Sequence, residues 1–442
     1  MRVMKWSMIA LAVSAAGTQL AMASSQDDSK GFVEDSTLTA KTRMEYMNRD
    51  FKNGAGNNAR ADGTFKSGYR QDTGVSELIQ YSSGFTQGTV GVGVDAYAMG
   101  TLKLDGGAGR SGNGLFAKDS DGAEERTQSA AGGAIKFRLS DTVLKYGNQT
   151  VASPVFSTDD SRLLPEIATG ATITSNEIKG LELSAGRYTA LRSQTGQYND
   201  SINGRNSAGL KNPGLTAANI VGATYKFTDN LVGGLAASKV EDYFKKEYVN
   251  LNYTLPIDNS QSLNFDFNGY RTKDDGKALY GKLDNKLWSF ATAYSIGPNK
   301  FTVAYQRSTG DTNYLYGVDG NGTIFVANSI QISDFIGQEE RSWQARYDLN
   351  MATLGVPGLS FMARYVKGDN IRTSSDTEGK ENEFNFETKY VMQEGPAKDL
   401  SFRLRSAVYR ANSAYNTDYA ADNNDVRLIV EYPLDLMALA KR

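Results

Sequence analysis

Two neighbouring stretches of this chain alternate apolar and polar residues with a period of two, and this pattern restricts the fold more than any other feature. In residues 249–255, Val, Leu, Tyr and Leu alternate with Asn, Asn and Thr; in residues 263–268, Leu, Phe and Phe alternate with Asn, Asp and Asn. A β-strand places successive side chains on opposite faces, so each stretch has one apolar and one polar face. The pattern predicts a hairpin that has water on one side only.

Residues 399–410 show the same alternation with charge on the polar face. Arg403 and Arg405 project to one side, and three apolar residues project to the other: Phe402, Leu404 and Val408. A soluble sandwich would bury the apolar face, whereas a membrane barrel turns it to lipid and the arginines to a water-filled lumen. Arg410 has the opposite parity to Arg403, so we expect it at the rim.

The first 23 residues favour the membrane alternative. They contain a basic tip (Arg2 and Lys5), an apolar run at 8–13 and the small-residue site Ala21-Met22-Ala23, which is typical of a cleaved export signal. We therefore expect residues 1–23 to be a signal peptide and residues 24–442 to form one outer-membrane barrel. After residue 23 no segment approaches roughly 18 consecutive apolar residues, so any membrane crossing is made by strands.

Two absent residue types exclude most catalytic and metal-binding classes. The chain has no histidine and no cysteine, so it can supply neither a Ser-His-Asp triad nor a thiolate metal site. It has 48 basic and 50 acidic residues, a balance that does not fit a nucleic-acid-binding protein. Residues 107–112 match a dinucleotide fingerprint by letter, and 119–122 resemble part of a calcium loop, but neither has the required context. We expect no cofactor, no metal ion and no nucleic-acid partner.

Short turn-forming segments allow the strands to be counted. Eight of them punctuate the chain, at residues 84–88, 140–142, 179–180, 228–230, 256–260, 297–299, 355–358 and 394–399. A longer polar loop is expected between each neighbouring pair. If both termini lie on the short-turn side, the eight turns divide the chain into nine hairpins, or about 18 strands of an antiparallel β-barrel. The fold class predicted is all-β, with long extracellular loops. Four aromatic residues are expected in the belts at the membrane interfaces: Tyr248, Tyr253, Trp288 and Tyr294.

Several longer motifs resemble the OprD family of substrate-specific outer-membrane porins found in pseudomonads. They lie at residues 31–36, 83–90, 131–134, 161–165, 266–268, 327–329, 343–350, 356–359 and 395–403. Together they span essentially the whole chain after residue 23, and they look closest to the branch whose substrates are basic amino acids and related carboxylates. The resemblance implies an eighteen-stranded barrel that works as a single pore, whose lumen is narrowed by an inward-folded constriction loop.

The resemblance also implies a set of substrate-contacting residues. The basic ladder of the family matches Arg162, Lys389, Arg403, Arg405 and Arg427, with Arg49 and Arg60 as less secure outer members. Tyr316 and Asp334 match an electronegative pocket on the opposing loop. A family acid just before residues 324–325 is replaced here by Gly322 and Thr323, which weakens the expected preference for a substrate cation. The alternative for the ladder is a wall of ion pairs that does not contact solute, and for Arg162 an anchor to backbone carbonyls.

These features predict a passive, substrate-selective porin in the outer membrane of a Gram-negative bacterium. It would carry small carboxylate nutrients such as basic amino acids, and its other partners would be outer-membrane lipid, lipopolysaccharide and the barrel-assembly machinery. The pore would be monomeric, with loose association into trimers left open. An outer-membrane barrel hydrolase is the alternative, disfavoured by the missing histidine, and a receptor energised from the inner membrane would need a plug domain ahead of the first strand.

Overall fold

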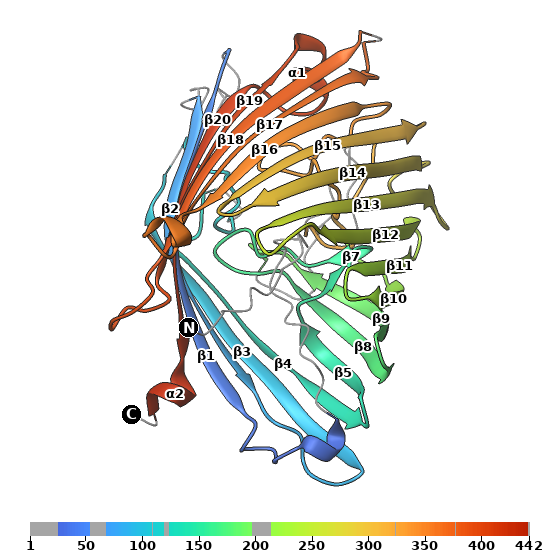
Figure 1. Cartoon of the computed structure of the whole chain (residues 1–442). Coiled ribbons are helices and arrows are strands. Elements are labelled where there is room, and N and C mark those ends of the chain that lie inside the picture. The colour runs from blue at the N-terminus through green and yellow to red at the C-terminus, as the bar shows by residue number, and fades with distance from the viewer. Residues whose placement is uncertain are drawn as a thin grey trace.

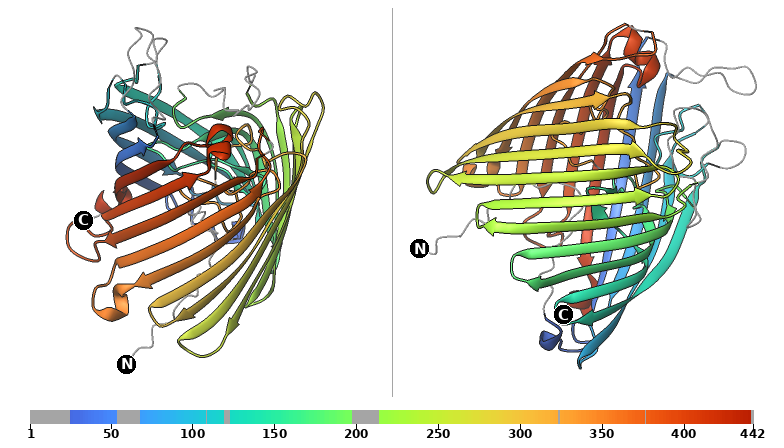
Figure 2. Two further views of the ribbon diagram at one scale, coloured as in Figure 1. Left: turned by 90° about the horizontal axis from the view of Figure 1, so that it is seen from above. Right: turned by 90° about the vertical axis from the view of Figure 1, so that its right-hand side faces the viewer.

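The chain folds into one closed antiparallel barrel, which confirms the predicted fold class. The computed structural model describes residues 25–53, 68–107, 109–118, 123–196, 214–322, 324–375 and 377–440. In these residues eighteen strands form a single sheet, which closes because β1 (Thr37–Phe51) pairs with both β2 (Tyr69–Ser82) and β20 (Asn423–Asp435). Figure 1 shows the strands side by side in chain order, and Figure 2 shows blue β1 beside the red final strands.

The remaining elements follow in chain order. The other barrel strands are β3 (Val90–Asp105), β4 (Thr127–Leu139), β5 (Thr142–Gln149), β8 (Ile167–Ile178), β9 (Leu181–Arg192), β10 (Ala218–Thr228), β11 (Leu231–Val240), β12 (Phe244–Pro256), β13 (Gln261–Asp274), β14 (Asp284–Ile296), β15 (Asn299–Gly310), β16 (Arg341–Asn350), β17 (Leu359–Ile371), β18 (Gly379–Val391) and β19 (Ser401–Ala411). The short elements are η1 (Gln26–Asp28), β6 (Ala152–Ser153), β7 (Phe156–Ser157), η2 (Met351–Leu354), α1 (Ser413–Asp418) and α2 (Leu436–Ala440). Within the described ranges no helix is long and apolar enough to cross a membrane.

The eight predicted short turns all join successive barrel strands, beginning with the one between β2 and β3. Because bacterial barrels place short turns on the periplasmic side, this rim is periplasmic and the other is extracellular.

The expectation of a long polar loop after every second strand is wrong at one position. Residues 241–243 alone join β11 to β12, and Tyr243 in this turn is fully buried. Its hydroxyl donates to the Gly214 carbonyl (2.7 Å), and its ring packs on that of Tyr280.

The outer face of the barrel is apolar, as the alternation predicts. Phe402, Leu404 and Val408 are exposed on β19, on the face opposite to Arg403 and Arg405. Tyr253 and Trp288 also lie on outward-facing positions. The assignment of Tyr248 to the interface belt is wrong, because it differs from Tyr253 by an odd number of residues and so faces inward. There it is buried, and its hydroxyl donates to Asn268 Oδ1.

Lipid exposure of this face leads to a first testable result. Val303 lies mid-strand in β15 and is 61% exposed. Val303→Arg is expected to lower the free energy of unfolding by about 2–4 kcal/mol, because it places a charge in the hydrocarbon layer. Denaturant unfolding of the barrel in lipid vesicles measures this loss, with Val303→Leu as the matched control. Equal stability of the two variants would contradict the assignment of this face to lipid.

Two extracellular loops fold into the barrel and narrow it, as predicted. We call them L3 (residues 150–166, between β5 and β8) and L7 (residues 311–340, between β15 and β16). Their apolar side chains join those of the strand wall in one buried cluster, which includes Val155, Phe156, Tyr188, Tyr270, Leu287, Tyr314, Val318 and Ile336. Burial of each such side chain contributes roughly 1.5–3 kcal/mol. This apolar packing attaches both loops to β9–β14, while polar contacts attach L3 to β1 and L7 to β15, β16 and β18; the rest of the lumen stays open.

Candidate functional site

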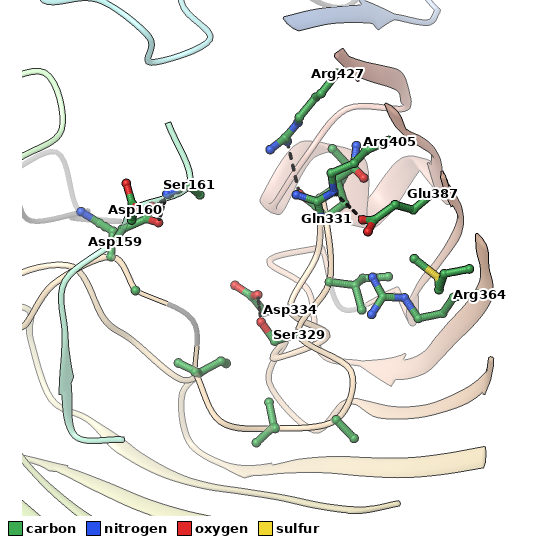
Figure 3. A pocket seen from close by; sticks show the side chains of 18 of the residues that line it. Asp159, Asp160, Ser161, Ser329, Gln331, Asp334, Arg364, Glu387, Arg405 and Arg427 are labelled. Carbon is green, nitrogen blue, oxygen red and sulfur yellow. Dashed lines mark hydrogen bonds and ion pairs between the residues drawn. The ribbon is translucent and has the colours of Figure 1, made fainter. Parts of the chain in front are cut away.

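The open part of the lumen is a polar cavity of about 1280 Å³. L3 and L7 form one side of it, and β13 to β20 with β1 and β2 form the other. Among the described residues, eleven basic and seven acidic side chains line this cavity. Its lining therefore carries a net charge of +4, although the whole chain carries −2. Figure 3 shows Arg364, Arg405 and Arg427 pointing from the strands toward the acids on the two loops.

Arg403 and Arg405 lie on the inner face of β19, as predicted, and share one acidic partner. Arg403 Nη2 is 2.8 Å from Glu387 Oε2 on β18, and Arg405 Nε is 3.3 Å from the same oxygen. Register explains the contact, because Glu387 pairs directly with Arg405 across the two strands. The wall therefore contains ion pairs, as the alternative interpretation expected. One carboxylate is shared by two guanidinium groups, so positive charge remains for a solute.

Arg427 and Arg49 form a second arrangement of the same kind around Asp425. Asp425 Oδ1 lies 2.7 Å from Arg427 Nε, and Asp425 Oδ2 lies 2.9 Å from Arg49 Nη2. Gln331 of L7 also donates to Asp425 Oδ1, at 2.8 Å. The Asp425 side chain is fully buried, so this group fixes both arginines and joins the tip of L7 to the wall.

Arg162 reaches the cavity from L3 and is also bound to backbone carbonyls. Its Nε donates to the Asn113 carbonyl at 3.1 Å and its Nη1 to the Ser161 carbonyl at 3.0 Å. Burial and, to a smaller extent, the charge of Arg427 lower the pKa of Arg162 to about 10. The guanidinium is therefore still cationic at neutral pH. The anchoring role expected as the alternative is present together with access to the lumen.

A cluster of ion pairs between L3 and the barrel wall lies beside Arg162. Asp160 of L3 is 2.9 Å from Lys41 Nζ and 2.9 Å from Arg43 Nη1, both on β1. Burial acts to raise the pKa of Asp160, but the charges of Arg43 and Lys41 outweigh it and hold that pKa below its usual value. Arg43 also contacts Glu431 on β20. These contacts hold L3 against the strands that carry the basic wall.

Tyr316 and Asp334 meet on L7, on the side that faces the arginines. The Tyr316 hydroxyl donates to Asp334 Oδ2 at 2.7 Å, and Ser329 Oγ donates to Asp334 Oδ1 at 2.6 Å. Hydroxyl donors orient this carboxylate without cancelling its charge. Figure 3 shows Asp334 and Ser329 between the L3 acids and the arginine wall. The lumen therefore has an electropositive side and an electronegative side at the same constriction.

Glu166 joins the two inward loops. Its Oε2 accepts from the backbone N–H groups of Asp159 (3.0 Å) and Asn321 (2.8 Å), and its Oε1 accepts from Asn321 Nδ2 (2.7 Å). Burial raises the pKa of Glu166 to about 7, although the hydrogen bonds from Asn321 oppose this rise. L3 and L7 are thus fixed to each other as well as to the barrel.

Some of the predicted site residues do not line the cavity, and some residues that line it were not predicted. Lys389 faces inward on β18, but it lies toward the periplasmic end of the strand and outside the cavity lining. Arg60 and Thr323 lie outside the described residues. Six basic residues of the lining were missed: Lys41, Arg43, Arg70, Lys300, Arg346 and Arg364. Strand parity could have found some of them, since Lys41 and Arg43 share the parity of Arg49 on β1.

Comparison with known proteins places this architecture among outer-membrane porins. The model of the family "outer membrane porin, OprD family" matches residues 30–436. Porin D of Pseudomonas aeruginosa is 45% identical over 463 aligned residues, covering 99% of this chain and 100% of that protein. OccAB1 of Acinetobacter baumannii has a similar crystal structure, with a TM-score of 0.85, 33% identity and coverage of 93% of this chain and 100% of that chain. For P. aeruginosa OpdK, crystallised with vanillate, the TM-score is 0.82 at 31% identity, covering 91% and 100%.

Proposed function

The chain belongs to the OprD family of outer-membrane porins, and we propose that it admits small carboxylate-bearing nutrients such as basic amino acids by passive diffusion. It is a channel of the Gram-negative outer membrane and not an enzyme. The selectivity proposed here arises from the basic ladder, in which Arg162, Arg403, Arg405 and Arg427 line the cavity with Arg49.

The observation that carries this proposal is the net charge of +4 in the cavity lining of a chain whose overall charge is negative. An excess of fixed positive charge in a narrow polar lumen attracts anions and raises their local concentration. Arginine suits this role because its planar guanidinium binds a carboxylate through two hydrogen bonds and stays charged at physiological pH. Sharing of Glu387 and Asp425 keeps each arginine site shallow, so a solute is attracted without being trapped.

Two further features support the class of solute. Asp334 faces the arginines with no ion-pair partner in the described part of the chain, so a zwitterion would be oriented across the lumen with its cation toward L7. Vanillate, named with the crystal structure of OpdK, is itself a small carboxylate. For this chain we extend that chemistry to carboxylates that also carry a cation.

The remaining assignments belong to the same proposal. Residues 1–23 would act as a cleaved export signal, and the lipid and lipopolysaccharide of the outer membrane would contact the apolar outer face. The barrel-assembly machinery would insert the strands. Because the cavity is lined by one chain, each barrel would conduct alone, with or without loose trimers.

Planar-bilayer recording tests the ladder. Arg405→Ala and Arg162→Ala should each lower arginine and lysine flux by about tenfold, since a lost guanidinium–carboxylate contact is worth about 1.4 kcal/mol or more. Both variants should also shift the reversal potential toward lower anion preference. Asp229→Asn, an exposed change in a periplasmic turn, is the control. Unchanged flux and unchanged ion selectivity in both arginine variants would exclude the ladder mechanism.

A further inference from the structure

L7 is attached to six consecutive strands along one row of wall residues. Backbone N–H groups of Phe325 and Ala327 donate to Tyr270 on β13 and to Ser289 on β14, both at 3.0 Å. The attachments continue at Gln306 (β15), Ser342 (β16), Gly368 (β17) and Glu383 (β18). At Gly368 a side chain would collide with Phe335 and Glu340 of the loop. This attachment row marks the level at which L7 meets the wall.

A second row lies four residues closer to the periplasm on each of the same strands. From β13 to β18 it consists of Asp266, Ala293, Thr302, Arg346, Arg364 and Glu387. Every member lines the cavity. Four strand residues span roughly 13 Å, so this lower row lies beyond the level where L7 meets the wall. A solute that has passed the Asp334 pocket must travel along it to leave.

Asp266 is the negative end of the lower row. Its Oδ1 accepts from Asn252 Nδ2 at 2.8 Å and from Asn250 Nδ2 at 3.1 Å, and its Oδ2 accepts from Asn268 Nδ2 at 2.6 Å. Among the described residues no basic side chain forms an ion pair with Asp266. Three neutral amides therefore hold the carboxylate rigidly on the lumen wall and leave its charge uncompensated.

Arg364, on β17 and next to last in the row, is the matching positive charge. Its Nε and Nη2 donate to Asn385 Oδ1, at 3.0 and 2.9 Å, and in the described chain it makes no ion pair. The neighbouring Arg346 differs, because Asp348 neutralises it through two contacts of 2.8 and 2.7 Å. Arg364 and Asp266 are thus the two charges of this row that neutral amides position and that form no ion pair in the described part of the chain.

Between these two charges the lower row carries no basic or acidic side chain that lacks an ion-pair partner in the described chain. Ala293 and Thr302 supply the side chains of β14 and β15, and the neutralised Arg346 supplies that of β16. Four strand spacings, roughly 19 Å, separate β13 from β17 along the sheet. Asn385 holds the guanidinium of Arg364 toward β18, but the sheet curves around the lumen, so the straight path between the two inward-facing charges is shorter than this distance along the sheet. This geometry suits an extended solute whose opposite charges are several bonds apart.

We propose that Asp266 and Arg364 form a second binding station, on the periplasmic side of L7, for extended zwitterions such as basic amino acids. The solute's side-chain cation meets Asp266 and its carboxylate meets Arg364, while its methylene chain lies over Ala293 and Thr302. This station rests on the proposed function, since it is the next site for a solute released from the Asp334 pocket. Several weak sites in sequence speed passage through a selective pore.

Current recordings on the full-length protein in planar bilayers test the station through the dwell time of single solutes. Asp266→Asn should shorten lysine dwell by about fivefold, the size of one charge contact in a wet site, and leave butyrate dwell unchanged. Arg364→Gln should shorten both. In the Arg364→Gln background the effect of Asp266→Asn on lysine should shrink, because both ends hold one molecule. Asp258→Asn, in the turn of the same hairpin, should change neither.

The outcome that overturns the station is an Asp266→Asn variant that affects lysine and butyrate equally, or affects neither. If wild-type channels admit neither solute, the proposed function itself has failed. The wild type gives a second measurement that does not depend on folding of variants. Across ω-amino acids from glycine to aminohexanoate, dwell time should increase with chain length, and a flat profile would also overturn the proposal.

Discussion

Replacing Asp319 by alanine is expected to release L7 and to raise single-channel conductance several-fold. Asp319 Oδ2 lies 2.5 Å from Lys246 Nζ, and their side chains are only 3% and 1% exposed. The ammonium also lies over the rings of Phe244 and Tyr314, at 4.6 and 4.5 Å from their centroids. Removing one partner of such a buried pair leaves an uncompensated charge, which costs about 3–5 kcal/mol. Displacing L7 is the way for Lys246 to regain water.

Conductance and solute discrimination are the measurements for this variant. We expect larger currents and smaller differences between lysine and neutral amino acids, because the constriction and the Asp334 pocket are both on L7. The strand hydrogen bonds are not involved, so the barrel should keep its resistance to denaturation. The double replacement Lys246→Met with Asp319→Leu should restore conductance toward the wild-type value, since an apolar pair of similar volume can replace a buried ion pair. Wild-type conductance in Asp319→Ala would show that the pair does not hold the loop.

Loss of Asp425 is expected to have the second-largest effect, on charge selectivity. Asp425→Asn keeps the shape of the site but leaves Arg427 and Arg49 without their shared carboxylate. Two adjacent uncompensated guanidinium groups bind anions more tightly, so the anion preference of the pore should increase several-fold. Carboxylate flux should fall, because a deeper site releases solute more slowly.

Reversal potentials in a salt gradient and single-solute dwell times measure these two effects. Carboxylate dwell should lengthen in Asp425→Asn and stay constant in Asp229→Asn, which removes the same charge from an exposed turn. A selectivity equal to that of wild type would mean that Gln331 and the remaining polar groups, not Asp425, determine how strongly these arginines attract anions.

The barrel could be predicted because its rules are local. Period-two alternation assigns each strand residue to lipid or lumen, and turn residues mark the periplasmic rim, so strand number followed without any knowledge of contacts. The same rule placed Arg403 and Arg405 correctly. It also turns Tyr248 to the lumen, because Tyr248 and Tyr253 are an odd number of residues apart, so an aromatic residue near a strand end does not by itself indicate the interface belt.

The lumen could not be predicted to the same depth because its geometry depends on register and on loops. That Glu387 stands opposite Arg405 is a property of two paired strands, and neither strand sequence contains it. Arg364 was missed for a similar reason. Its neighbour is the neutral amide of Asn385, whereas Arg346 has the carboxylate of Asp348 as its ion-pair partner. The tight turn at residues 241–243 depends on Tyr280 and Gly214, which are distant in the chain.

The way in which L7 is fastened has an evolutionary consequence. The wall side chains at β13, β14, β15 and β18 bind mainly backbone groups of the loop: the N–H groups of Phe325, Ala327, Asn328, Ile332 and Ser333 and the carbonyls of Asp334 and Phe335. Every residue type other than proline offers these groups. Loop side chains that face the lumen can therefore mutate while the loop stays in place. The substrate selectivity of the pore can thus change during evolution without a change in the fold.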